Sequence, residues 1–319
     1  VEIRVVGTRK GIFRLRGLVS FGVIKKLSKL IKDEVPDVLV SFMLFTNALT
    51  IIAKKISGAT CKVISSERYG LKLSYEGWFT ESQRKAVIRF LYPAANIIVV
   101  NAREMGEHLK DMYQMPPEKL EVIYNPIDIE KITRLSKEKS DHNWFYENIP
   151  IIMAAGRLTR QKGFDYLLKA FCKLLSEKIS SRLMILGKGE EEENLKGLAE
   201  QLNLRDKVEF LGFQQNPYKY LSHSTLFVLS SLYEGFPNVL LEAMALGIPS
   251  VATRCPTGPD EIITEGVDGI LVPPANEKAI ADAIKKLLLD ENLRKRLSEA
   301  GKSRIQDFAV EKIVKQYED

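Results

Sequence analysis

The chain has 319 residues, a length that suits two domains of ordinary size better than one. With 45% hydrophobic and 28% charged residues and no low-complexity tract, its composition excludes a disordered or fibrous protein. The net charge of +6 is one-sided, because residues 1–149 hold 24 Lys+Arg against 17 Asp+Glu while residues 150–319 hold 23 against 24. The first half is therefore expected to meet an anionic partner.

Short runs rich in β-branched residues alternate with longer amphipathic stretches along the chain, which predicts parallel sheets covered by helices. The expected strands are Val1–Val6, Val38–Phe42, Cys61–Ser65, Ile97–Val100, Glu121–Ile123, Ile151–Ala154, Leu183–Leu186, Val208–Leu211, Leu226–Leu229, Ser250–Thr253 and Gly269–Val272. The expected helices are Val23–Asp33, Phe45–Ser57, Thr80–Tyr92, Ala102–Met112, Asp165–Leu175, Glu190–Leu202, Val239–Leu246, Glu277–Leu288 and a last run through Ser298–Lys315.

A polar, charge-rich stretch from Lys131 to Asn148 separates two series of strands. We therefore expect an α/β protein of two Rossmann-like domains that face each other across a cleft, over residues 1–149 and 150–319. Ligands of such sheets bind at the carboxyl ends of the strands. Because the sequence opens directly on the strand that begins at Val1, we expect the first domain to be incomplete at its N-terminus.

Metal, disulfide and membrane-spanning chemistry find no support in the sequence. The three cysteines are far apart and form no Cys-x-x-Cys pair, and the three histidines lack the spacing of two ligands on one helix face. The sequence contains no run of 18 apolar residues, and we expect neither a spanning helix nor a signal peptide. We expect no metal, no cofactor and a reducing cytoplasmic location.

Arg157 and Lys162 follow the strand Ile151–Ala154 in a loop bounded by Gly156 and Gly163. The guanidinium of Arg157 can fork onto phosphate oxygens while the ammonium of Lys162 acts as a point charge, so the loop suits a diphosphate. The alternative is a solvated loop before a helix. A later turn, Gly187-Lys188-Gly189, is followed by four glutamates that would repel a phosphate, and we interpret it as a turn that lines the cleft.

Two carboxylates stand eight positions apart, Glu234 in the loop after Leu226–Leu229 and Glu242 in the expected first turn of the next helix. Both would then face that helix N-terminus, whose free N–H groups attract phosphate. A carboxylate also accepts hydrogen bonds from sugar or ribose hydroxyls. The alternative is that Asn238 caps the helix and a glutamate in the first turn stabilises it.

Four motifs follow one another in the second half: Gly156-Arg157-Leu158-x3-Lys162-Gly163, Phe210-Leu211-Gly212, Glu234-Gly235-Phe236-Pro237-Asn238-x3-Glu242-Ala243 and Gly247-Ile248-Pro249-x-Val251-Ala252-Thr253. In kind and order they resemble the retaining glycosyltransferases of family 4 (glycosyl transferases group 1), which have the GT-B fold. The resemblance is specific over residues 150–275. It implies that the second domain binds a nucleotide-sugar donor and the first domain an acceptor.

The resemblance also implies roles for single residues. Arg157 and Lys162 would neutralise the departing diphosphate, Glu234 would bind the transferred sugar, and Glu242 would take the ribose hydroxyls. The resemblance implies further donor-binding residues. Gly156 is one of them, and the turn Gly212, Phe213 and Gln214 would contact the base. The others are Gly235, Phe236, Pro237, Asn238 and Val239, and the backbone from Phe236 to Val239 would place its amides near the sugar and the distal phosphate. The segment Cys255–Glu261 is similar to one common among members that use UDP-sugars. No catalytic histidine can be assigned.

The implied reaction moves a hexose or N-acetylhexosamine to a glycan or lipid-linked acceptor in bacterial surface polysaccharide assembly, with retention and without a metal. The basic helix within Leu18–Ile31 resembles a peripheral membrane helix, but the sequence favours the alternative of a helix that packs on the sheet with a solvated basic edge. A sugar-nucleotide epimerase of the same architecture is an alternative. A basic nucleic-acid-binding protein is a further alternative with little support, since no nucleic-acid module appears.

Overall fold

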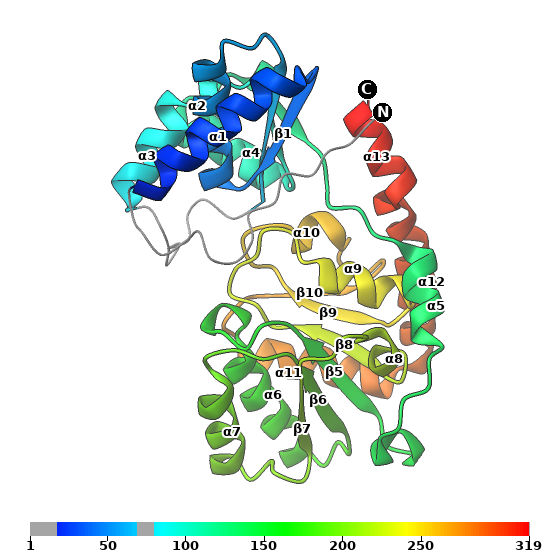
Figure 1. Ribbon diagram of the computed structural model, residues 1–319. Coiled ribbons are helices and arrows are strands. Elements are labelled where there is room, and N and C mark those ends of the chain that lie inside the picture. The colour runs from blue at the N-terminus through cyan, green and yellow to red at the C-terminus, as the bar shows by residue number, and fades with distance from the viewer. Residues whose placement is uncertain (1–17, 69–79, 319) are drawn as a thin grey trace. The chain divides into compact units, whose positions relative to one another are not determined.

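The computed structural model describes residues 18–68 and 80–318, and it divides into two compact units (Figure 1). Within these residues the first unit comprises 18–68, 80–100 and 106–122, and the second comprises 101–105 and 123–318. The first predicted strand, Val1–Val6, lies outside the described residues.

The first unit is a four-stranded parallel sheet in the order β1-β2-β3-β4. Its strands are β1 (Val38–Phe42), β2 (Lys62–Glu67), β3 (Ile97–Val100) and β4 (Leu120–Val122). Its helices are α1 (Leu18–Glu34), α2 (Leu44–Ser57), α3 (Glu81–Phe90) and α4 (Arg103–Tyr113), the last of which begins in residues grouped with the second unit. Helix α1 packs on α2 around Ile31 and Ala53, so its apolar stripe is buried or half-buried and its lysines face solvent.

The second unit is a six-stranded parallel sheet in the order β10-β9-β8-β5-β6-β7. Its strands are β5 (Ile151–Ala155), β6 (Arg182–Leu186), β7 (Val208–Gly212), β8 (Leu226–Leu229), β9 (Ser250–Thr253) and β10 (Ile270–Val272). Its helices are α5 (Ile129–Ser136), α6 (Phe164–Ser176), α7 (Glu192–Gln201), α8 (Tyr218–Leu221), α9 (Asn238–Ala245), α10 (Pro259–Ile262), α11 (Glu277–Leu289), α12 (Glu291–Arg304) and α13 (Val310–Glu318).

Apolar side chains cover both faces of this sheet. Leu167 and Phe171 of α6 and Ile284 of α11 are fully buried in one core with Ile152 and Leu183 of the strands. Helix α9 contacts β8 and β9 and lies on the other side, above the sheet in Figure 1. Strands buried on both faces explain why the sequence shows continuous apolar runs here rather than alternation.

The predicted α/β class with two parallel sheets is confirmed, and the described strands lie within two residues of their predicted bounds. The predicted run Ser298–Lys315 is wrong as one helix. Helix α12 begins earlier than predicted, at Glu291, and Asp290 caps it by accepting the backbone N–H of Leu293. The helix then ends at Arg304, and a short 3₁₀ turn, Ile305–Phe308, separates it from α13. The break has a tertiary cause, because the Phe308 carbonyl accepts the backbone N–H of Ile127 at 2.8 Å.

The stretch predicted as a polar connection contains helix α5. Asp128 caps it by accepting the backbone N–H of Lys131 at 2.9 Å, and Ile132 buries its apolar face against α8 and α9. Contacts therefore group residues 123–149 with the second unit, whereas the sequence prediction placed them in the first domain.

Candidate functional site

The strand order of the second unit creates a natural binding position. From β5 the chain builds outward through β6 and β7 on one side, and from β8 through β9 and β10 on the other. Strands β5 and β8 are therefore neighbours whose following loops diverge, which is the topological switch point where open parallel sheets bind ligands. The predicted cations follow β5 and the predicted Glu234 follows β8.

Lys162 and Glu234 meet at this switch point. The ammonium Nζ of Lys162 lies 2.6 Å from Glu234 Oε1, and the two side chains are only 14% and 6% exposed. A buried ion pair is strongly coupled, because removing either partner leaves an uncompensated charge in a site of low dielectric. The structure thus brings together two predicted residues that are 72 positions apart.

The backbone around Glu234 is held by the loop after β9. The Glu234 N–H donates to the Pro256 carbonyl at 2.7 Å, and the Glu234 carbonyl accepts the N–H and the hydroxyl of Thr257 at 3.2 and 3.1 Å. Cys255 lies beside this clamp, and burial, followed by the nearby Glu234 charge, raises the pKa of its thiol to about 12. Cys255 is therefore a protonated packing residue. The backbone that carries the Glu234 carboxylate is held in place.

The loop after β5 is shaped by close backbone approaches. Gly163 has φ 59°, and a Cβ there would lie 2.3 Å from the Ser230 carbonyl oxygen. A Cβ on Gly156 would lie 3.3 Å from Cδ and Cε of Lys162, so the lysine stem passes directly over that glycine. Arg157 is exposed, and no other described residue is hydrogen-bonded to or ion-paired with its side chain. Of the two cations predicted to bind the diphosphate, Lys162 is paired and Arg157 is open to a ligand.

Glu242 does not join this group. It lies in the second turn of α9, because the helix begins at Asn238 and has no acidic residue in its first turn, so the predicted position is corrected. Its Oε1 accepts the Tyr218 hydroxyl of α8 at 3.3 Å. Burial raises the pKa of Glu242, a rise that the Tyr218 hydrogen bond partly offsets, and burial beside this carboxylate raises the pKa of Tyr218 to about 12.

Asn238 is not the cap of α9, because Pro237 holds that position and offers no side-chain hydrogen bond. The amide oxygen of Asn238 instead accepts Nδ2 of Asn125 at 2.7 Å. Nearby, the Phe236 ring stacks on Tyr124 with centroids 5.1 Å apart. The first N–H groups of α9, from Asn238 and Val239, thus start beside Gly235 without a capping side chain.

The predicted base-contacting turn follows β7. Gly212 takes φ 66°, Phe213 is 72% exposed, and Gln214 donates to the Leu211 carbonyl at 2.6 Å. The Gly212 carbonyl accepts the N–H of Gly187, which ties this turn to the loop after β6. An exposed aromatic ring at the carboxyl end of a strand offers an apolar surface to a flat ligand.

Sequence reasoning missed three residues that are hydrogen-bonded to predicted site residues: Ser231, Tyr218 and Asn125. Tyr218 and Asn125 contact partners from distant segments, and Ser231 contacts a carboxylate three residues away. A single serine, tyrosine or asparagine in a sequence does not indicate such a contact. Ser231 is fully buried and donates to Glu234 Oε1 at 2.6 Å.

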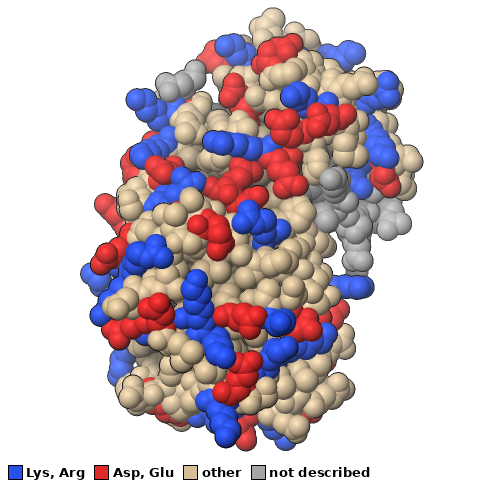
Figure 2. Space-filling model, turned by 180° about the vertical axis from the view of Figure 1, so that it is seen from behind, with Lys and Arg blue, Asp and Glu red and all other residues tan. Residues whose placement is uncertain are grey.

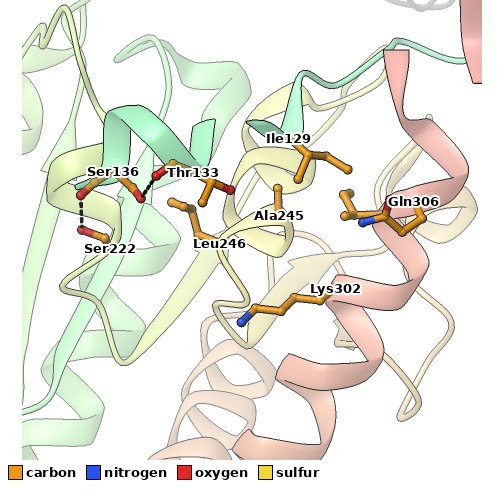
Figure 3. A pocket seen from close by; sticks show the side chains of 9 residues that line it. Ile129, Thr133, Ser136, Ser222, Ala245, Leu246, Lys302 and Gln306 are labelled. Carbon is orange, nitrogen blue, oxygen red and sulfur yellow. Dashed lines mark hydrogen bonds between the residues drawn. The ribbon is translucent and has the colours of Figure 1, made fainter. Parts of the chain in front are cut away.

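A separate pocket of about 350 Å³ lies between α5, the end of α9 and α12 (Figure 3). Ser222 donates to the Ser136 carbonyl on one side, and Lys302 and Gln306 lie on the other. None of the predicted site residues lines this pocket. We assign the candidate site to the switch point, where the charged pair lies, and not to this pocket.

Within residues 18–68 and 80–318, no group of three His, Cys, Asp or Glu side chains could hold a metal ion. None of the helices in this part of the chain is long and apolar enough to cross a bilayer. Figure 2 shows cationic and acidic side chains interspersed over one face, with no continuous basic area there.

Comparison with known proteins identifies the family. Residues 136–304 match the family model described as glycosyl transferases group 1, and residues 1–131 match that of glycosyltransferase family 4. An uncharacterized glycosyltransferase of Methanocaldococcus jannaschii is 32% identical over 92% of this chain and 80% of its own length. The N-acetylgalactosamine-N,N'-diacetylbacillosaminyl-diphospho-undecaprenol 4-alpha-N-acetylgalactosaminyltransferase of Campylobacter jejuni is 31% identical over 91% of this chain and 77% of its length.

Solved structures share the fold. The Anabaena protein HepE in complex with UDP has a TM-score of 0.78 at 21% identity, over 92% of this chain and 80% of that one. The lipopolysaccharide outer core galactosyltransferase WaaB has a TM-score of 0.75 at 20% identity, over 95% and 80%. The chain therefore belongs to glycosyltransferase family 4 (glycosyl transferases group 1) and has the GT-B fold.

Proposed function

We propose that this chain transfers a hexose or N-acetylhexosamine from a UDP-sugar to a glycan or lipid-linked acceptor, with retention of the anomeric configuration. The observation that carries the proposal is the Lys162–Glu234 pair at the switch point of a Rossmann-like sheet. A cation for the diphosphate and a carboxylate for sugar hydroxyls stand together there, which is what a nucleotide sugar needs at its reacting centre.

In the proposed reaction the bond between the anomeric carbon and the diphosphate oxygen breaks, and its electron pair leaves with the diphosphate. Arg157 and Lys162 stabilise that developing charge, so no metal and no cofactor are required for this step. The acceptor hydroxyl attacks the same face of the oxocarbenium-like centre. Its proton passes to the departing oxygen, which balances the transfer.

The choice of UDP has independent support from the sequence and from a fold neighbour. The segment Cys255–Glu261 is similar to one found in UDP-sugar enzymes, and HepE has been solved with UDP and with UDP-glucose. We assign the ribose to Glu242 and the base to the turn Gly212-Phe213-Gln214, where the exposed ring lies. The backbone N–H groups of Phe236, Asn238 and Val239 would meet the sugar and the distal phosphate.

The relatives support an acceptor on the bacterial surface-glycan route. One is named for transfer to a diphospho-undecaprenol-linked sugar, and the lipopolysaccharide core biosynthesis glycosyltransferase LpsE of Rhizobium meliloti is 32% identical over 69% of this chain and 62% of its own length. We therefore propose a cytoplasmic enzyme that works at the inner face of the membrane. The lysines of α1 would attract that anionic surface.

Thermal unfolding of the whole chain with UDP, GDP and ADP and their sugars, measured with and without EDTA, tests the donor. We expect UDP compounds to raise the melting temperature most, since a ligand that binds only the folded state stabilises it. Arg157→Ala and the double variant Lys162→Met/Glu234→Gln should each remove that rise. The double variant avoids leaving Glu234 buried without its partner.

Lys188→Ala is the matched control, because Lys188 is also exposed and lies on the neighbouring loop after β6. It should keep the full rise in melting temperature. An equal loss in all three variants would place the phosphate site elsewhere, and a rise that EDTA removes would show that a metal supplies the charge.

A further inference from the structure

The two oxygens of the Glu234 carboxylate are not equivalent. Oε1 accepts the Lys162 ammonium and the Ser231 hydroxyl, each at 2.6 Å. Oε2 accepts no hydrogen bond from any residue of the part of the chain that the structure describes. A carboxylate oxygen offers about two acceptor positions, so Oε1 is saturated while Oε2 keeps its capacity.

Ser231 is itself fixed. It is fully buried at the end of the segment that follows β8, and its carbonyl accepts the Thr253 hydroxyl at 2.5 Å. Because its hydroxyl lies three residues before Glu234, the hydrogen bond closes the loop on itself. Together with the backbone clamp at Pro256 and Thr257, this leaves the carboxylate little freedom to rotate.

We propose that Ser231 is a positioning residue that holds Glu234 so that Oε2, and not Oε1, receives a hydroxyl of the transferred sugar. The inference rests on the proposed function, and it adds the residue that orients the carboxylate of Glu234. A donor diphosphate drawn to Lys162 weakens the hold of the lysine on Oε1. The serine hydrogen bond then remains to keep the carboxylate in place, which is the moment at which orientation matters most.

The test separates recognition of the sugar from recognition of the nucleotide. Affinities of the whole chain are measured by calorimetry for UDP and for UDP-glucose, UDP-galactose, UDP-N-acetylglucosamine and UDP-N-acetylgalactosamine. Ser231→Ala should weaken binding of the preferred UDP-sugar about tenfold, the range expected for one hydrogen bond to a charged group, and leave binding of UDP unchanged. Ser231→Thr, which keeps the hydroxyl, should restore most of the loss.

Ser250→Ala is the matched control, because Ser250 is equally buried in β9 but donates only to the Ile248 carbonyl. Ser250→Ala should not alter the ratio of the affinity for the preferred UDP-sugar to the affinity for UDP. In a Glu234→Ala background, Ser231→Ala should add no further loss, since the group that it orients is gone.

The outcomes are distinguishable. A wild-type chain that binds neither UDP nor any of the four UDP-sugars overturns the proposed function itself. A wild-type chain that binds them, with Ser231→Ala either indistinguishable from Ser250→Ala or equally weakened for UDP and the UDP-sugar, overturns only the positioning role.

Discussion

At the scale of single residues, Glu242 shows a conflict between stability and binding. Burial raises the pKa of Glu242 above its usual value, so the folded state prefers the neutral acid and is destabilised once the carboxylate ionises. A carboxyl whose pKa is raised by folding stabilises the folded state fully at a pH below its pKa in the unfolded chain. This stabilisation is lost as the pH rises through its pKa in the folded chain. In the proposed function the ionised group accepts ribose hydroxyls, so the form that binds is the form that costs stability.

We therefore predict that Glu242→Gln raises the melting temperature of the free protein at pH 7 to 8 while weakening UDP binding roughly tenfold. Gln is neutral throughout, so its stability advantage should shrink as the pH falls through the raised pKa of Glu242 toward the ordinary pKa of a glutamate side chain. Melting curves measured from pH 4.5 to 8 check this trend. A stabilisation that is the same at every pH would contradict the pKa argument.

The residue scale also shows which site residues the sequence could predict. The sequence could predict Arg157, Lys162 and Glu234, because charged side chains close to glycines after a strand indicate a ligand-binding loop. Their roles stay predictions, although the structure pairs two of them. Ser231 and Tyr218 were not predictable, because a hydroxyl becomes functional only through the carboxylate that the fold places beside it.

At the scale of elements, the loops after neighbouring strands are locked together through their backbones. Gly187 takes φ 137°, and a Cβ there would lie 1.8 Å from the carbonyl oxygen of Gly156. The Gly156 N–H also donates to the Leu186 carbonyl at 2.9 Å. The loop after β6 therefore determines where the loop that carries Arg157 and Lys162 can lie.

Gly187→Ala should accordingly lower the free energy of unfolding by about 2–4 kcal/mol and displace the cation loop, with loss of the UDP-induced rise in melting temperature. Gly197→Ala provides the control in the adjacent helix α7, since no atom lies within 4 Å of the Cβ that it would add. It should raise stability by up to about 1 kcal/mol through helix propensity. Similar melting temperatures for both variants would show that the two loops are not locked.

Elements were predictable where local pattern decides and unpredictable where tertiary contacts decide. The strands could be predicted because short apolar runs rich in β-branched residues favour strands that are buried on both faces. Helix α5 was missed, since its buried face rests on Ile132 within a charge-rich stretch. The break after α12 was missed because the pairing of Phe308 with Ile127, 181 residues earlier, has no local signal.

At the scale of the whole molecule, the two units differ in what they offer to a partner. The second unit holds the complete candidate donor site on one sheet. The first unit holds most of the excess positive charge, and on α1 the exposed Lys25, Lys29 and Lys32 continue a stripe that begins at Phe21, which is 72% exposed. An aromatic ring followed by lysines suits an anionic lipid surface, where the ring enters the interface and the lysines meet headgroups.

We predict that the whole chain sediments with vesicles containing phosphatidylglycerol but not with pure phosphatidylcholine, and that rising salt reduces this binding. Substituting Lys25, Lys29 and Lys32 by Gln should weaken the binding about a hundredfold, because three lysines that each contribute roughly 1 kcal/mol near the surface together contribute about 3 kcal/mol. The charge-matched control substitutes Lys173, Lys278 and Lys286 of the second unit, which are also exposed. Since both triple variants lower the net charge equally, an equal loss of binding would show that bulk charge, and not α1, attracts the membrane.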